Sequence, residues 1–381
     1  MRCIWTWAIF CAAVCGAADP SVEFEPLFRE AAARLERQYG ADSPRTAAAW
    51  RDLGLLLLEN GKPAEAERWL RRALAVHQQQ SDDGLEAARD REALAAALLA
   101  QGDGAGAEPL YRQALAARIE LQGEKHPETA DLRVRLGMLL EAKGDLAGAE
   151  RQYRSSVEAV PDGDVLERLS GLAEARGDLD AAEAAAKQAL ALREKTLGPQ
   201  HPKTAAARNA LGLLAMNAGR LDEASTQFEN AIAAYRAGPG LEREDAAFAL
   251  DNLGNVRRAQ GRYDEAKALL EQALAVRRAV LGDEHPDTAT TLVNLGGLYH
   301  VQGKLAQAEP LYRRAIAIQQ KQLGANDPVV GQTMFNLGHL LAAKGDRAGA
   351  VEAFRQAAAI LEQAYGPNDE MVVEIRGLLA R

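Results

Sequence analysis

The sequence predicts an all-α protein in which similar helical hairpins follow one another as a solenoid, and three observations favour this fold class. The first is internal repetition, because DNLG at Asp251 returns as VNLG at Val293, 42 residues later. The second is composition, because only 5% of the residues are aromatic and alanine, leucine, arginine and glutamate dominate. The third is a fixed register of glycine, alanine and leucine. Self-similarity at such a period is typical of stacked supersecondary units.

Residues 1–18, MRCIWTWAIFCAAVCGAA, have the pattern of a secretory signal peptide, with Arg2, an apolar run and then small residues. We expect cleavage near Ala18 and an exported protein, periplasmic or secreted. The run is shorter than the about 20 residues that span a bilayer as a helix, so we expect no membrane span.

The cysteines all lie in this leader, at Cys3, Cys11 and Cys15. The mature chain would therefore carry no thiol for catalysis, for a disulfide or for a zinc site. Attachment of a lipid to Cys15 is the alternative to simple cleavage.

Residues 19–40 are predicted to form an amphipathic N-terminal capping helix that ends at Gly40. We expect its apolar stripe to cover the face that the first hairpin would otherwise expose, as the ends of solenoids require. The stripe consists of Phe24, Leu27, Phe28, Ala31 and Leu35.

Residues 41–369 are predicted to hold eight repeats, each turning at a glycine between a first helix and an antiparallel second helix. Five residues after each turn glycine stands an alanine, eight before it a leucine, and seven before it a small residue. The turn glycines are Gly61, Gly102, Gly144, Gly177, Gly219, Gly261, Gly303 and Gly345.

The small residue calls for a packing explanation, because glycine inside a helix costs about 1 kcal/mol relative to alanine. We expect Gly254, for example, to let the first helix approach Ala266 of the second closely, with Leu270 beside them. The residue nine after the turn glycine is bulky except at Ala186, so the fourth repeat is expected to have the thinnest core.

The loops between repeats read GADSP, GEKHP, GPQHP, GDEHP and GANDP, which suit a left-handed glycine followed by a proline in the first helical turn. Ser43 or Asp327 is expected to cap the helix that follows. Three histidines occupy the same slot, and because they recur one or more repeats apart we interpret them as structural caps rather than as a metal or catalytic site. They are His126, His201 and His285.

The small residue, turn glycine, alanine and bulky residue at these offsets resemble the tetratricopeptide repeat, and the 42-residue units are similar to the kinesin light chain type. The resemblance implies a right-handed superhelical α-solenoid of about eight hairpins. Leu379 lies 42 residues after Leu337, so residues 370–381 are expected to form a C-terminal capping helix.

Several functions are disfavoured by the residues. The formal charge of -9 and the pI near 5.4 argue against binding to nucleic acid. No phosphate-binding loop, metal-ligand spacing or nucleophile elbow is present in the sequence, so we expect neither an enzyme nor a cofactor or metal site.

The resemblance implies a concave groove lined by residues 2, 3, 6, 9, 10 and 13 before each turn glycine. A row of asparagines, Asn252, Asn294 and Asn336, recurs there in the last three repeats and suits the backbone of an extended peptide. Bonding to neighbouring helix carbonyls is the alternative. The candidate groove residues are Asn252, Asn255, Arg258, Asn294, His300, Phe335, Asn336 and His339.

Tetratricopeptide domains that bind the C-terminal carboxylate of chaperones use two asparagines and three basic residues. Asn255 and Asn294 match the asparagines, but Asp251, Gln332 and Asn336 replace the basic residues, so chaperone tails are not expected as ligands. The first four repeats carry a more charged groove, for which either a polar partner or simple solvation would account. Its residues are Arg51, Asp52, Arg89, Glu92, Asp131, Arg135, Glu141, Glu167, Arg168 and Glu174.

The sequence therefore predicts an exported, non-enzymatic scaffold that binds a protein or peptide in its groove. The alternative is a structural or assembly component that acts through its convex face or its ends by self-association. A light-chain role in motor transport follows from family likeness alone, and the predicted signal peptide argues against it.

Overall fold

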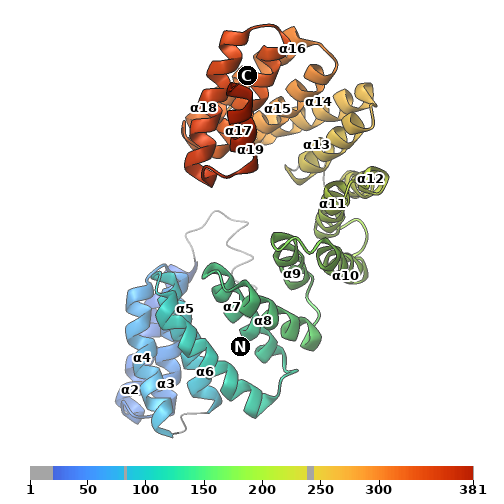
Figure 1. Ribbon diagram of the computed structural model, residues 1–381. Coiled ribbons are helices and arrows are strands. Elements are labelled where there is room, and N and C mark those ends of the chain that lie inside the picture. Colours follow the sequence, from blue (N-terminus) through green and yellow to red (C-terminus); the bar gives the residue numbers. More distant parts are fainter. Residues whose placement is uncertain (1–19, 81–83, 238–243, 381) are drawn as a thin grey trace. The chain divides into compact units, whose positions relative to one another are not determined.

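The computed structural model describes residues 20–80, 84–237 and 244–380, which form eighteen helices and no strand (Figure 1). The predicted all-α fold is confirmed. The predicted signal peptide lies outside the described residues. The helices are α2 (Pro20–Tyr39), α3 (Pro44–Glu59), α4 (Pro63–Gln80), α5 (Leu85–Ala100), α6 (Gly104–Gln122), α7 (Pro127–Ala142), α8 (Leu146–Ala159), α9 (Gly163–Ala175), α10 (Leu179–Leu197), α11 (Pro202–Asn217), α12 (Leu221–Ala237), α13 (Glu244–Ala259), α14 (Tyr263–Val280), α15 (Pro286–Val301), α16 (Leu305–Leu323), α17 (Pro328–Ala343), α18 (Arg347–Tyr365) and α19 (Glu370–Leu379).

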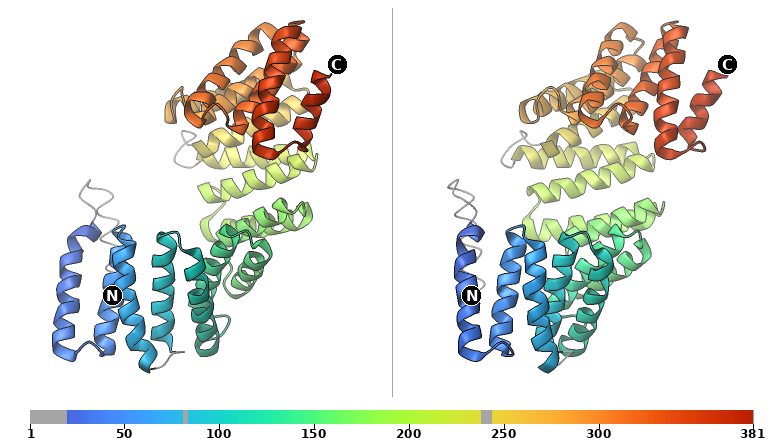
Figure 2. Two further views of the ribbon diagram at one scale, coloured as in Figure 1. Left: turned by 60° about the vertical axis from the view of Figure 1, so that its left-hand side comes forward. Right: turned by 90° about the vertical axis from the view of Figure 1, so that its left-hand side faces the viewer.

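The chain divides into two compact units, one up to Leu172 and one from Ala173 onward, and the boundary falls within α9. Within each unit, the two helices that flank a turn glycine pack as a hairpin, and the second helix of a hairpin packs on the first helix of the next. Figure 2 shows the helices of the first unit standing side by side in this way. Below, odd-numbered helices from α3 to α17 are the first helices of the repeats, and even-numbered helices from α4 to α18 the second helices.

The glycines lie in two kinds of turn, and both need the left-handed backbone that glycine alone adopts without strain. The eight turn glycines have φ between 68° and 84°. The loop glycines that follow second helices, such as Gly282 and Gly324, have φ of 91° and 100°. The left-handed conformation predicted for the loop glycines is therefore confirmed, and the turn glycines share it.

In six of the eight first helices the small residue is a glycine, and it makes room for a ring or a leucine rather than mainly for an alanine. A Cβ on Gly338 would lie 2.6 Å from Phe354, and one on Gly212 would lie 2.5 Å from Phe228. At Gly254 the nearest atoms belong to Leu270, at 2.8 Å, and the backbone of Ala266 follows at 3.4 Å. The expected close approach to alanine is thus secondary. The bulky residue nine positions after the turn glycine fills the missing Cβ space.

The histidines before the loop prolines act as helix caps, as predicted. Nδ1 of His126, His201 and His285 accepts a hydrogen bond from the backbone N–H two residues on, at 3.1–3.2 Å. Asp327 caps α17 in the same way, whereas Ser43 makes no side-chain cap, so that prediction is wrong.

A threonine two residues after the loop proline was not singled out from the sequence, although it recurs in four repeats. The hydroxyl groups of Thr46, Thr204 and Thr288 each donate to the carbonyl of the preceding loop glycine at 2.8 Å. These buried hydroxyls fix the loop on the helix that it precedes.

Helix α2 docks on the first hairpin through a different face from the one predicted. Ala32 and Glu25 are buried, and Glu25 binds Lys62 (2.9 Å) and Arg29 (2.8 Å). Hydrogen bonds from Lys62, Arg29 and Asn60 lower the pKa of Glu25 to about 2. Of the predicted apolar stripe, Leu27 is 58% exposed, so the prediction that this stripe covers the hairpin is wrong.

Candidate functional site

The predicted groove residues of the second unit lie on the first helices α13, α15 and α17, which contact one another in order. We call their groove positions the groove face of the second unit. All eight candidate residues are partly buried. The groove face consists of Phe248, Asp251, Asn252, Asn255, Arg258 and Ala259 on α13, Thr290, Val293, Asn294, Gly297, His300 and Val301 on α15, and Gln332, Phe335, Asn336, His339, Ala342 and Ala343 on α17.

Two of the three asparagines in the row interact with side chains of neighbouring first helices rather than with helix backbones. Nδ2 of Asn252 donates to Oδ1 of Asn209 on α11 at 3.3 Å. A side-chain hydrogen bond with Asn294 lowers the pKa of the Asp251 carboxyl group, against the effect of burial. Asn336 makes no side-chain hydrogen bond to any residue that the structure describes. Within the described ranges, none of the three donates to a carbonyl of a neighbouring helix, so this alternative receives no support.

The buried acceptor of Asn255 has no partner. Its Oδ1 is enclosed, yet it accepts no hydrogen bond from the described part of the chain. A buried amide oxygen without a donor costs about 1–3 kcal/mol, so this position favours a donor supplied by water or by a ligand.

Arg258 is the cation of the groove face, and it has no carboxylate partner among the described residues. Its guanidinium crosses directly over Gly297, where a Cβ would lie 2.5 Å from Nη1. The absence of a side chain at Gly297 therefore leaves room for the guanidinium of Arg258. Burial raises the pKa of the neighbouring Tyr312 to about 12, although the charge of Arg258 opposes the shift.

The far end of the groove face is aromatic. The rings of Phe335 and His339 meet edge to face at 4.5 Å, and His339 meets Phe354 at 5.2 Å. Burial and the charge of His339 lower the pKa of His300, so the imidazoles of α15 and α17 lie within electrostatic range of each other. Neutral imidazoles offer one donor and one acceptor each.

Beneath the groove face, Asp251 and Arg277 form a buried ion pair that sequence reasoning missed. Asp251 is 4% exposed and Arg277 is 1% exposed, and their Oδ2 and Nη1 atoms are 2.7 Å apart. Thr291 donates to the same Oδ2 at 2.9 Å. Burial raises the pKa of Asp251 to about 6, against the effect of Arg277. The one carboxylate of the groove face is thus occupied inside the protein.

The arginine of this pair has counterparts in other repeats, and their spacing was a signal in the sequence. Arg118, Arg193 and Arg277 each lie sixteen residues after a turn glycine. Arg277 donates to the backbone oxygen of Asp287 at 2.6 Å, and Arg193 donates to that of Lys203 at 3.0 Å. The arginine therefore ties α6, α10 and α14 to the start of the first helix that follows each of them.

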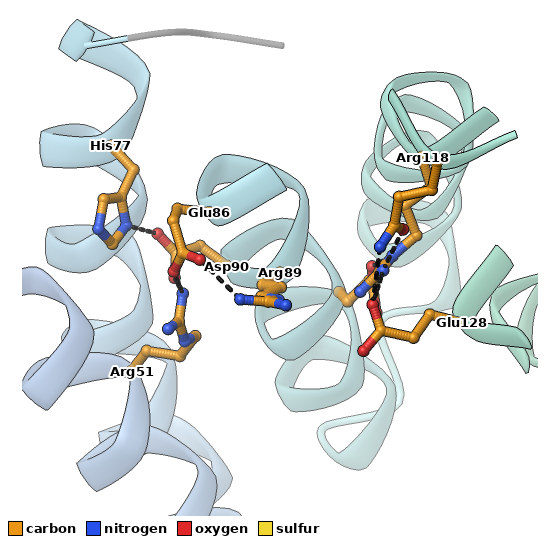
Figure 3. Close-up of polar contacts among 9 residues, drawn as sticks. Arg51, His77, Glu86, Arg89, Asp90, Arg118 and Glu128 are labelled. Carbon is orange, nitrogen blue, oxygen red and sulfur yellow. Dashed lines mark hydrogen bonds and ion pairs between the residues drawn. The ribbon is translucent and has the colours of Figure 1, made fainter. Parts of the chain in front are cut away.

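In the first unit, charged groove residues form ion pairs with other charged side chains of the same unit (Figure 3). Arg51 of α3 pairs with Glu86 at 2.7 Å and with Asp90 at 3.2 Å, both on α5. Asp90 also contacts Nδ1 of buried His77 at 2.5 Å.

The pairing continues along the first unit. Arg118 of α6 binds both Glu92 of α5 and Glu128 of α7. Hydrogen bonds from Gln122 and Arg118 lower the pKa of Glu128 to about 2. Further on, Glu141 binds Arg168 at 3.3 Å. We call this series of contacts the ion-pair row. Ion pairs within the protein therefore involve several of these charged groove residues, among them Arg51, Glu92 and Glu141, while the choice between solvation and a polar partner stays open for the rest.

No group of three metal-ligating side chains occurs among residues 20–80, 84–237 and 244–380, and none of the helices in these ranges is long and apolar enough to cross a membrane. A cavity of about 490 Å³ lies between α12, α13 and α14, lined in part by Ile232, Leu253 and Leu269. It contains none of the predicted groove residues.

Comparison with known proteins gives the following matches. The family model of the tetratricopeptide repeat matches residues 22–79, 87–162, 163–237, 245–321 and 287–363. A search of curated protein sequences finds no match. A tetratricopeptide repeat protein from Parabacteroides merdae is similar in fold, with 18% identity, coverage of 77% of this chain and 99% of that one, and a TM-score of 0.57.

Two further solved structures are similar to part of this chain. A putative kinesin light chain from Podosopora anserina is 26% identical, with 52% of this chain and 95% of that chain covered and a TM-score of 0.44. BtubC from P. vanneervenii is 24% identical, with 65% and 94% covered and a TM-score of 0.49.

Proposed function

This chain belongs to the tetratricopeptide repeat family, and on that premise we propose that it is a non-enzymatic scaffold that binds an extended segment of a protein partner on the groove face of the second unit. Proteins of this family generally act as interaction scaffolds. We choose this surface because several of its polar groups keep free hydrogen-bonding capacity.

The groove face offers what an extended backbone needs. A peptide backbone presents one donor and one acceptor per residue, and carboxamides match both. Asn336 and the Oδ1 atom of Asn255 have no partner among the described residues, and Asn252 uses one donor on Asn209. Arg258 adds a cation without a counter-charge inside the protein.

The first unit is a weaker candidate for the same role. Its groove charges already meet charges on neighbouring helices, as Arg51 meets Glu86 and Glu141 meets Arg168. A ligand would have to break these pairs before it could use them, at a cost in free energy that free amides do not carry.

The test is partner capture with the triple variant Asn252→Ala, Asn294→Ala and Asn336→Ala, alongside Arg258→Ala. We expect the triple variant to lose at least tenfold in the amount of partner captured from the native source, identified by mass spectrometry. A matched control replaces three exposed amides of second helices, Asn230, Gln272 and Gln320, with alanine and should capture as the unchanged protein does. Equal capture by both triple variants would exclude this face.

The predicted export places the partner in the periplasm or outside the cell. N-terminal sequencing of the protein from its native source tests this, since a mature chain that begins at Asp19 is expected. Detection of Met1 in the mature protein would contradict export by cleavage.

A further inference from the structure

We propose that α2 of one copy of this chain packs against α19 of a second copy, so that the two helices form a hairpin like those within the chain. This surface is separate from the groove face, and the proposal goes beyond peptide binding. Within the described residues, α2 packs chiefly on α3, and α19 packs chiefly on α18.

Helix α2 has the features of a second helix, but no first helix precedes it among the described residues. It ends at the loop glycine Gly40, as α18 ends at Gly366. Glu25 binds Lys62 beside the next turn, just as Glu309 of α16 binds Lys344. Helix α2 therefore contacts the following repeat through the same side that the second helix α16 uses.

The other side of α2 is open. With the loop glycines of α2 and α18 aligned, Ala31 corresponds to Ala357 and Leu35 to Leu361. Ala357 and Leu361 are fully buried in the α17–α18 hairpin, whereas Ala31 is exposed and Leu35 is only partly covered. Together with exposed Leu27, they leave an apolar strip where a first helix would pack.

Helix α19 has the complementary features of a first helix. It follows a loop of the same kind, and Asp369 caps it with hydrogen bonds from two backbone N–H groups. Leu379 and Ala380 repeat the leucine and the small residue found at Leu337 and Gly338. The side that would meet a second helix is open, because Val373 is 55% exposed where its counterpart Gly331 is buried.

The α17–α18 hairpin gives the register of the proposed pair. There, Gly331 lies under Leu361 and Gly338 lies under Phe354. The same register sets Val373 beside Leu35 and Ala380 beside Phe28 of the second copy. Val373 is larger than Gly331, so the two helices would stand somewhat further apart than those within a repeat.

Charge complementarity favours a second copy as the occupant. Arg34 and Arg37 lie near the end of α2 and pair with no carboxylate that the structure describes. Glu370 and Glu374 lie at the start of α19 and likewise have no cationic partner in the described ranges. In an antiparallel pair of this register, the basic end of α2 meets the acidic start of α19.

A single pair of helices makes a small interface, so we expect weak association that depends on concentration. Because two different surfaces meet, the contact is heterologous and adds copies in series. Salt should weaken it, since exposed charges contribute to it.

The first experiment measures mass by sedimentation velocity over a hundredfold range of protein concentration. We expect the average mass to rise with concentration, and Arg34→Glu with Arg37→Glu to shift the rise to at least fivefold higher concentration. Adding Glu370→Lys and Glu374→Lys to the same chain should restore it. A constant monomer mass at every concentration would overturn the proposal, and so would failure of the restoring substitutions.

The second experiment tests the register by disulfide cross-linking in a chain whose Cys3, Cys11 and Cys15 are replaced by serine. Copies with Leu35→Cys are mixed with copies carrying Val373→Cys, and a mixed dimer is expected after oxidation. The control is Leu121→Cys, which is 51% exposed on α6 and should not cross-link to Val373→Cys. Equal cross-linking of the control, or a chain with both cysteines that closes only on itself, would contradict pairing between copies.

Discussion

Asp251 shows how much a single residue depends on neighbours from other helices. Its position in the sequence is that of a groove residue, yet it lies buried against Arg277 of α14 and Thr291 of α15. Its Oδ1 accepts no hydrogen bond of good geometry in the described chain, which leaves part of its charge uncompensated. Burial therefore dominates and raises the pKa of Asp251.

This shift predicts a pH dependence with a definite sign. The pKa of Asp251 rises from 3.8 to about 6 on folding, so the folded protein retains a proton that the unfolded chain loses between these values. The contribution of Asp251 to the free energy of unfolding should therefore fall as pH rises from about 4 to about 6, by up to about 3 kcal/mol.

The measurement is urea unfolding of the unchanged protein and of Asp251→Asn at several pH values. The difference in unfolding free energy should favour the unchanged protein more at pH 4 than at pH 7. A difference that does not vary with pH would show that Asp251 ionises normally.

Glycines in first helices give a second prediction at the residue scale. Gly338→Ala should destabilise the protein by about 1–3 kcal/mol, because the new Cβ would lie 2.6 Å from the ring of Phe354. Gly171→Ala serves as the matched control, since no atom lies within 4 Å of a Cβ there. That change should stabilise the protein by about 0.5–1 kcal/mol, as measured by thermal unfolding. Destabilisation by both changes would refute the packing explanation.

At the scale of the element, helix starts are fixed by side chains in the loops. Histidine is an uncommon cap, but Nδ1 of His285 accepts from the N–H of Asp287 at 3.2 Å and replaces the hydroxyl or carboxylate of the usual caps. The same loop is held by Thr288, whose hydroxyl donates to the carbonyl of Gly282. The loops before α11 and α15 therefore each carry two local hydrogen bonds that need no distant partner.

Substitution of His285 tests the cap directly. His285→Ala should cost about 0.5–2 kcal/mol of stability, and His285→Asn should retain most of it, because asparagine also caps helices. Hydrogen exchange in the first turn of α15 should rise in the alanine variant and stay slow in the asparagine variant. Equal exchange in the two variants would mean that the imidazole does not act as a cap.

At the scale of the whole molecule, the two units differ in how their groove positions are used. In the first unit the ion-pair row joins neighbouring first helices, as Arg51 joins α3 to α5. In the second unit these positions hold amides, imidazoles and the uncompensated Arg258. The same repeat thus supports a face with several paired charges in one unit and an open polar face in the other.

Salt should separate the two units experimentally. Raising sodium chloride from about 0.05 M to about 1 M screens the more exposed members of the ion-pair row, such as Glu141 and Arg168, because the Debye length falls to about 3 Å. Hydrogen exchange should therefore accelerate more in α3, α5 and α7 than in α13, α15 and α17. The second unit is the internal control, and an equal response in both would show that the ion-pair row adds little to stability.

The sequence by itself determined the helices, the hairpins and the turns of this protein. The offsets around Gly303 or Gly345 recur so regularly that they indicate where each helix begins and ends, and the left-handed glycines and most of the caps follow from local chemistry. Such features depend on residues only a few positions apart in the chain.

Only the tertiary structure decided which side chains meet across helices. The sequence predicted a covered face for Leu27, which is exposed in the structure, and a groove position for Asp251, which lies in a buried ion pair. It predicted no role for Arg118, which lies between two carboxylates. The physical reason is that these contacts depend on how far long side chains reach between neighbouring repeats. Spacing along one helix fixes the direction of a side chain, but not what the next helix offers it.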